Sequence, residues 1–224
     1  MKPIQNLGLG LPNYNKGQLG IFHMLLHAAI VHARYVTKVI PAYTWLNTEN
    51  DAVDVARNKI VSKARENGCD AIAWIDTDLF IPEDAITRLV LMSNAGHPVA
   101  GGLYRQARAP YTLLCQRTPG QWATLEELTE HEDGGLVNVF TMAGGFTIIR
   151  MEVYDVLERD HGKPFFMNFD KEAGDQCYDD TYIFRRIRKS GFPIVADPHL
   201  HAVHWSHFGP VPVVEGQPEM RFCA

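Results

Sequence analysis

Short apolar runs that alternate with amphipathic segments characterise the first hundred residues. Apolar runs without charged side chains are typical of strands buried on both faces of a parallel sheet, and three such runs occur, at 7–11, 71–75 and 98–103. Between the runs, apolar residues recur every three to four positions, and this period predicts helices at about 18–33, 51–66 and 82–95. A further strand is predicted at 35–42, with a loop at 43–50. This alternation predicts a doubly wound α/β fold.

The second half of the chain has shorter and more polar segments. Two helices are predicted in it, one at about 152–159 and one from Tyr178 to just before Gly191. Turn-rich stretches separate the strand candidates, which are 111–115, 136–142, 146–150, 165–169 and 194–196. This pattern predicts a mixed, partly antiparallel region. Because no linker or repeat divides the chain, we expect one domain spanning residues 1–224.

Composition and charge narrow the class of protein. The 224 residues are 46% apolar and 21% charged, an ordinary balance for a soluble globular domain. The net charge of −5 disfavours a protein that wraps nucleic acid, although a local patch could still hold a nucleic-acid substrate. Four scattered cysteines without a Cys-x-x-Cys pair, and a start without the apolar stretch of a signal peptide, predict a cytoplasmic protein without membrane insertion.

Two carboxylates end the most apolar strand. Asp76 and Asp78 directly follow the run at 71–75, with one residue between them. Two like charges at the end of a buried strand are costly unless a cation compensates them. A hard divalent metal does so, and it can in turn hold the phosphates of a nucleotide. The structural alternative is that Asp76 begins a turn and Asp78 helps to cap the helix after Pro82.

Three motifs follow one another along the chain. They are Trp74-Ile75-Asp76-Thr77-Asp78 with Ile81-Pro82 after it, then Gly101-Gly102-Leu103-Tyr104-Arg105, and then Asp179-Asp180 at the start of a helix that ends before Gly191. Together they resemble those of small, single-domain glycosyltransferases of the GT-A fold, similar to the family-2-like enzymes of bacteria and their phages. The resemblance covers about residues 7–209. It implies a nucleotide-binding half at about 5–105 and an acceptor-binding, catalytic half at about 106–210.

The resemblance also implies a site for a nucleoside diphosphate sugar, such as a UDP-sugar. Asp76 would lie near the ribose or the sugar of this donor. Arg57 occupies a place where the family often has an arginine near the nucleotide, and a solvated helix arginine is the alternative. The turn at Gly144 and Gly145 resembles the small-residue turn that admits donor sugar and acceptor. Tyr104, in the second motif, belongs to the expected donor site.

A divalent metal is the cofactor that the resemblance implies. It would bridge Asp78 and the diphosphate, with Asp76 beside it. Near its end, the family often has a histidine followed two residues later by glycine, which serves as a further protein ligand. His207 fits this pattern, and His204 is the second candidate. Imidazole together with carboxylates suits Mn²⁺ better than Mg²⁺, which prefers oxygen ligands.

Asp179 and Asp180 match the paired acids from which the family draws its general base. A carboxylate that faces an acceptor hydroxyl can take its proton while the metal offsets charge on the leaving diphosphate. We assign Asp180 as the base, with Asp179 as the helix cap or a contact to the acceptor. The family usually has Glu-Asp where this chain has Asp-Asp, so the order of the two roles remains open.

The expected activity is transfer of a hexosyl or pentosyl group from a nucleoside diphosphate sugar to an acceptor hydroxyl. The acceptor is a glycan, a protein or a modified DNA base, and the location is the host cytoplasm if a phage encodes the chain. One alternative is a nucleotidyltransferase, although residues 13–17 match a basic, Gly-rich phosphate loop poorly. Another is a non-catalytic module that binds nucleotide or carbohydrate. Such a module does not need a second acidic pair.

Overall fold

A seven-stranded mixed sheet forms the centre of the computed structural model. The structure describes residues 1–13, 19–49, 51–130, 135–165, 168–170, 175–206 and 209–213. The strands of the central sheet are β1 (Asn6–Asn13), β2 (Ala42–Glu49), β3 (Ala71–Ile75), β5 (Val99–Leu103), β8 (Val137–Asn138), β10 (Phe146–Arg150) and β13 (Val195–His201). Their order is β2-β1-β3-β10-β5-β13-β8. Of these strands β10 and β8 run antiparallel to their neighbours, and the other five are parallel to one another.

Three small sheets extend the central one. One joins β4 (Leu79–Phe80), β14 (Val203–Ser206) and β15 (Gly209–Val211), and a second joins β6 (Cys115–Thr118), β7 (Gln121–Trp122) and β9 (Thr141–Met142). The third pairs β11 (Asn168–Asp170) with β12 (Asp175–Cys177).

The helices are α1 (Leu19–Val31), which continues into a π-helical segment (His32–Val36), α2 (Val53–Glu66), α3 (Ala85–Asn94), α4 (Leu125–Thr129), α5 (Met151–His161) and α6 (Asp179–Lys189). In the part of the chain described, no helix combines the length and the apolar character that crossing a bilayer requires.

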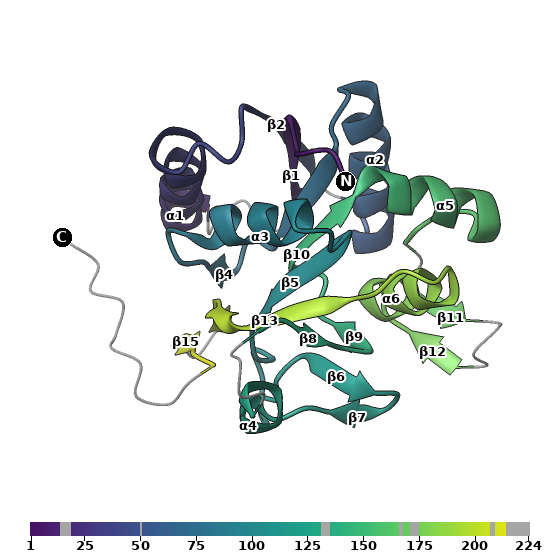
Figure 1. Ribbon diagram of the computed structural model, residues 1–224. Helices are drawn as coiled ribbons and strands as arrows, with labels where there is room; N and C mark the ends of the chain where they lie inside the picture. The colour runs from purple at the N-terminus through teal and green to yellow at the C-terminus, as the bar shows by residue number, and fades with distance from the viewer. Residues whose placement is uncertain are drawn as a thin grey trace.

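Helices cover both faces of the central sheet, with α1 and α3 on one face and α2 and α5 on the other (Figure 1). Strand β3 shows why the sheet needs two covers. Its Ala71, Ala73 and Ile75 pack into the core under α1 and α3, whereas Ile72 and Trp74 pack into the core under α2, α5 and α6. Both faces of β3 are therefore apolar, as its sequence predicted.

One edge of the sheet gathers the ends of strands from both halves of the chain. The parallel strands β1, β3 and β5 finish at this edge. Strand β10 runs the opposite way, with Phe146 opposite Ile75, so it starts where β3 ends. The residues before Phe146 therefore meet the residues after Ile75. This topology places the turn at Gly144 and Gly145 beside Asp76.

Two local predictions in the first fifty residues are wrong. The predicted strand at 35–42 is wrong: α1 continues as the π-helical segment through Val36, where Tyr35 and Val36 are exposed, and β2 starts only at Ala42. Most of the predicted loop at 43–50 instead forms strand β2, an edge strand of the central sheet. Tyr43 is half-buried and Trp45 is exposed on this strand, so its pattern lacks the fully apolar character of an inner strand.

The second half follows the prediction more loosely. Strand β10 and helix α5 lie where predicted, with α5 slightly longer. The predicted strand at 111–115 is wrong in place, because β6 starts at Cys115 and pairs with β7 and β9. The candidate at 136–142 divides into β8 and β9, which belong to different sheets. The fold class is nevertheless confirmed: it is α/β, with a mostly parallel central sheet and antiparallel additions.

Candidate functional site

Asp76 and Gly145 lie against each other at the carboxyl edge of the sheet. The Asp76 N–H donates to the Gly145 carbonyl oxygen over 2.9 Å. A Cβ atom at position 145 would fall 2.0 Å from Asp76 Oδ2, so a residue larger than glycine would displace this carboxylate. The Gly145 N–H in turn donates to the Tyr104 hydroxyl over 3.3 Å. The expected donor residues Asp76, Tyr104, Gly144 and Gly145 thus lie together.

Arg57 of α2 is buried beneath this edge. It is 4% exposed, so its alternative interpretation as a solvated helix arginine is wrong. Its Nη2 donates to Asp76 Oδ1 over 3.0 Å, and its Nε lies 3.0 Å from Asp179 Oδ2 in an ion pair without hydrogen-bond geometry. Its Nη1 is buried without a hydrogen-bond partner among the described residues, and it packs against Gly144. Both neighbouring carboxylates raise the pKa of the guanidinium against the effect of burial, so Arg57 stays charged.

Helix α6 brings the second acidic pair to the same place. Its N-cap is Tyr178, and no side chain caps it, so the proposed capping role of Asp179 is wrong. Asp179 is 7% exposed and its carboxylate faces Arg57 instead. Asp180 Oδ1 accepts the N–H of Thr181 over 2.6 Å, and the Asp180 carboxylate also accepts a backbone hydrogen bond from Gly144.

Three carboxylates, those of Asp76, Asp179 and Asp180, therefore gather around one arginine, and the pKa values of Asp76 and Asp180 are raised. Burial raises the pKa of Asp76 to about 6, and Asp78 adds to the rise while Arg57 opposes it. Burial also raises the pKa of Asp180, and the charge of Asp179 raises it further. Groups whose pKa moves toward neutrality are typical of sites that transfer protons or bind cations.

His204 lies beside Asp78. Its Nε2 is 3.2 Å from Asp78 Oδ2, and its Nδ1 is 2.8 Å from the carbonyl oxygen of Arg105. The pairing of β14 with β4 creates this contact, because it also joins the Trp205 N–H to the Asp78 carbonyl over 2.8 Å. Burial lowers the pKa of His204, but hydrogen bonding to Asp78 and its charge outweigh that effect and raise it overall. His207 lies outside the described residues.

Asp78 and His204 bring together a carboxylate and an imidazole, two ligand types that divalent metals accept. When Nδ1–H of the ring donates to the Arg105 carbonyl, the lone pair of a neutral imidazole is on Nε2, which faces Asp78. Within the described ranges, no cluster of three or more His, Cys, Asp or Glu side chains could hold a metal ion. Two protein ligands of this kind suit an ion whose other ligands come from a bound phosphate and water.

Two aromatic residues outside the predicted set of site residues support Arg57. The Arg57 guanidinium carbon lies 5.3 Å from the centre of the Trp74 ring and 5.6 Å from that of Phe165. Trp74 belongs to the first motif, and the signal for its role is that a large aromatic residue two positions before Asp76 is unusual in a strand otherwise made of Ala and Ile. Phe165 had no local signal, since more than a hundred positions separate it from Arg57.

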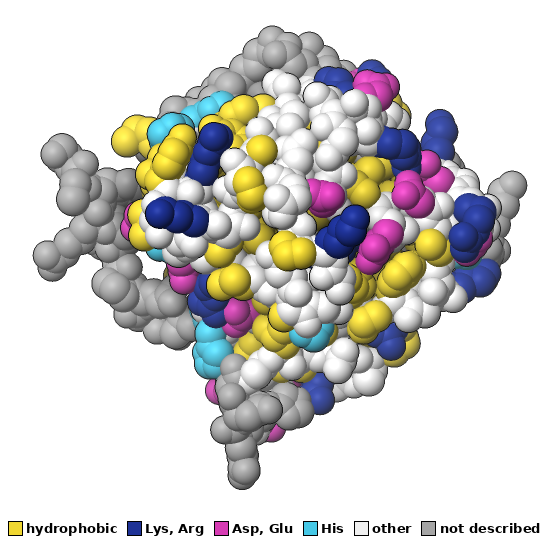
Figure 2. Space-filling model, turned by 45° about the horizontal axis from the view of Figure 1, so that its top comes forward, with side chains coloured by type: hydrophobic (Ala, Val, Ile, Leu, Met, Phe, Trp, Pro, Cys, Tyr) yellow, Lys and Arg dark blue, Asp and Glu magenta, His cyan; other side chains and the backbone are white. Residues whose placement is uncertain are grey.

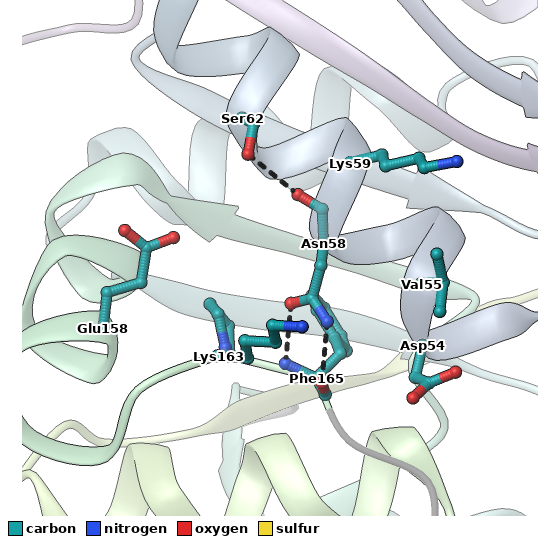
Figure 3. Close-up of a pocket in the computed structure, with 9 residues that line it drawn as sticks. Asp54, Val55, Asn58, Lys59, Ser62, Glu158, Lys163 and Phe165 are labelled. Carbon is teal, nitrogen blue, oxygen red and sulfur yellow. Dashed lines mark hydrogen bonds between the residues drawn. The ribbon is translucent and has the colours of Figure 1, made fainter.

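A cavity of about 430 Å³ lies between α2, the end of α5 and the segment that follows α5. It is lined by Asp54, Val55, Asn58, Lys59, Ser62, Glu158, Lys163, Pro164 and Phe165. Figure 3 shows Asn58 joined to Phe165 by two hydrogen bonds, in which the side-chain amide donates to the carbonyl over 2.7 Å and accepts the N–H over 3.1 Å. The cavity contains none of the expected site residues, but its inner wall holds Phe165 in place.

Comparisons with known proteins identify the fold. No known protein-family model matches the sequence, and no curated protein does. Among solved structures, A197 from STIV matches with a TM-score of 0.57 and 17% identity over 98% of this chain and 100% of its own. GalNAc-T7, determined with UDP, GalNAc and Mn²⁺, matches with a TM-score of 0.52 and 12% identity over 87% of this chain. The match spans 42% of the length of GalNAc-T7. The chain therefore has a mixed α/β fold of the GT-A type.

Proposed function

We propose that the protein is a metal-dependent glycosyltransferase that moves a sugar from a nucleoside diphosphate sugar to an acceptor hydroxyl. One observation carries this proposal: two acidic pairs from opposite halves of the chain meet at one edge of the sheet, around a buried arginine. The first pair, Asp76 and Asp78, has a histidine beside it and fits a metal. The second pair includes Asp180, whose carboxylate forms no ion pair with that arginine.

On the donor side, Asp78 and His204 would hold a divalent ion, with Mn²⁺ preferred over Mg²⁺ because of the imidazole. His207 remains a candidate further ligand and Asp76 a neighbour of the ion. When bound, the ion supplies positive charge that offsets the charge of a leaving diphosphate. The similarity to a structure with UDP and Mn²⁺ supports a UDP-sugar as the donor class.

On the acceptor side, Asp180 would act as the general base. Burial and the charge of Asp179 raise its pKa, which increases its strength as a base. The N–H groups of Thr181 and Gly144 orient the carboxylate. A base in this position favours inversion at the anomeric carbon, because it activates the hydroxyl for direct attack.

In the proposed single domain at 1–224, the two halves of the chain have different roles. Residues at about 5–105 would bind the nucleotide, and those at about 106–210 would bind the acceptor and supply the base. The acceptor is a glycan, a protein or a modified DNA base. The proposed location is the cytoplasm, of the host if a phage encodes the chain.

Joint binding of metal and nucleotide tests the proposal directly. We expect Mn²⁺ together with UDP to stabilise the protein by about 2.7 kcal/mol at a hundredfold excess over the dissociation constant. Neither compound alone should have this effect, because each supplies part of the other's ligand shell. Thermal unfolding with Mn²⁺, with UDP and with both is the measurement. A panel of nucleoside diphosphate sugars then identifies the preferred donor.

Two variants and one control make the metal experiment specific. Asp78→Asn and His204→Ala should each remove the joint stabilisation and leave the protein folded. His161→Ala is the control, since this last residue of α5 contacts Ser190, just after α6, and lies outside the site. If Asp78→Asn is stabilised as strongly as the wild type, the metal site assigned to this edge is wrong.

The identity of the released product separates a glycosyltransferase from a nucleotidyltransferase. We expect slow hydrolysis of the donor without acceptor to give an intact nucleoside diphosphate and a free sugar, because the bond between sugar and diphosphate breaks. Chromatography of the nucleotide products measures this outcome. Release of pyrophosphate from a nucleoside triphosphate would favour a nucleotidyltransferase, and binding without any turnover would favour a non-catalytic module.

A further inference from the structure

Arg57 is placed to do more than contact a nucleotide. It is the fifth residue of α2 and is 4% exposed. A guanidinium carries its charge at all ordinary pH values, and burying a charge is costly unless fixed opposite charges surround it. The contacts of Arg57 therefore show what its charge offsets.

Those contacts join the two halves of the chain. Arg57 pairs with Asp76, which follows β3, and with Asp179, which begins α6, each at 3.0 Å. Asp179 and Asp180 are consecutive, so without Arg57 the first turn of α6 would bring two carboxylates into the same enclosed space. Arg57 offsets the charge of Asp179 and so reduces the repulsion that Asp179 exerts on Asp180.

The guanidinium packs against two aromatic rings that also contact each other. The rings of Trp74 and Phe165 lie 5.3 and 5.6 Å from its central carbon. Trp74 is held by the hydrogen bond from its Nε1 to the Tyr154 hydroxyl, over 2.6 Å. Phe165 is held through its backbone by the two hydrogen bonds with Asn58 (Figure 3). A side chain fixed in this way can hold its partners at defined positions.

We propose that Arg57 is a positioning residue of the site: it holds Asp179 in an ion pair and thereby keeps Asp180 ionised and oriented toward the acceptor. This inference rests on the proposed function. Arg57 also fixes Asp76 against Gly145, so one side chain sets the distance between the donor carboxylates and the base. Its effect on transfer is exerted through Asp180 and does not require contact with the donor.

The double variant Arg57→Ala/Asp179→Asn gives the sharpest test. We expect Arg57→Ala to slow transfer about thirtyfold or more at saturating donor, because Asp180 then shares its surroundings with an uncompensated carboxylate. Adding Asp179→Asn removes that carboxylate, so it should restore about tenfold or more of the lost rate. A residue that only supports the fold would not show this suppression. The affinity for UDP in Mn²⁺ should change less than about fivefold in either variant.

Arg150 provides a matched control. It is the last residue of β10, at the end far from the site, and is 5% exposed. Its guanidinium donates hydrogen bonds to the side chains of Ser93 and Asn94 at the end of α3. Arg150→Ala should lose stability but keep its rate at temperatures where it is folded, and adding Asp179→Asn should not improve it. If Arg57→Ala does not fold, Arg57→Lys with and without Asp179→Asn makes the same comparison, with a smaller loss because lysine keeps the charge.

Two outcomes would overturn the inference. One is a double variant that transfers sugar no faster than Arg57→Ala. The other is an Arg57→Ala variant with an unchanged rate and a large loss of UDP affinity, which would make Arg57 a donor ligand.

If the wild type transfers no sugar, the proposed function fails, and denaturant unfolding then tests the role of Arg57 separately. The double variant should unfold at a higher denaturant concentration than Arg57→Ala. Equal or lower midpoints would contradict the role of Arg57 in offsetting Asp179.

Discussion

Asp180→Asn should reduce the rate of sugar transfer at least about a hundredfold and leave donor affinity within about threefold of the wild type. Asparagine keeps the size of the side chain and can still accept the N–H bonds of Thr181 and Gly144, but it cannot take a proton from the acceptor. A general base contributes about 3–5.5 kcal/mol to transition-state stabilisation, which corresponds to this loss. Single-turnover rates and UDP affinity measured on the same preparation separate chemistry from binding.

The pH dependence of the rate gives a second measure of the same residue. Because the pKa of Asp180 is raised and the base must be ionised, the rate should fall on acidification at a higher pH than an unperturbed carboxyl group would give. The fall should disappear in Asp180→Asn. If instead Asp179→Asn loses the rate and Asp180→Asn keeps it, the two roles are exchanged. If neither variant is slowed, the base lies elsewhere or the mechanism retains the anomeric configuration.

Asp179→Asn should mainly destabilise the fold. The substitution removes a charge that lies 3.0 Å from the buried Arg57, and breaking a buried ion pair from one side costs about 3–5 kcal/mol. The helix-cap interpretation would have given only about 1 kcal/mol. The free energy of unfolding in denaturant is the measurement, and the rate of the folded fraction should stay within about tenfold of the wild type.

Asp155→Asn is the control for this stability effect. Asp155 also pairs with an arginine, Arg65, at 2.9 Å, but its side chain is 61% exposed. Exposed ion pairs contribute less than about 1 kcal/mol, so this variant should unfold close to the wild type. A loss below about 1 kcal/mol in Asp179→Asn as well would mean that solvent or another group compensates Arg57 when Asp179 is absent.

Much of the fold followed from local patterns. Strands β3, β5 and β10 and helices α2, α3, α5 and α6 lie where the apolar period placed them, to within a few residues. The signal was strong because these elements bury one full face of a helix or both faces of a strand. Strand β2 was not predicted, because it is an edge strand that pairs with β1 alone and its aromatic residues are partly exposed.

The candidate site could be located in the sequence but not assembled. The sequence indicates four candidate carboxylates because charges at the ends of apolar strands and the starts of helices need compensation. They are Asp76, Asp78, Asp179 and Asp180. The sequence could not show that Arg57 lies between the two pairs. It also could not distinguish a cap from an ion pair at Asp179, because both need an acid at the first turn of α6.

The sequence by itself determined the apolar strands, the helices around them and the chemical types of the side chains at their ends. The tertiary structure alone decided which of those side chains share a counter-charge. The reason is that local periodicity reports burial, whereas ion pairing depends on strands and helices that meet across long sequence distances. The contact between Asp78 and His204 spans 126 positions, and it exists because β14 pairs with β4.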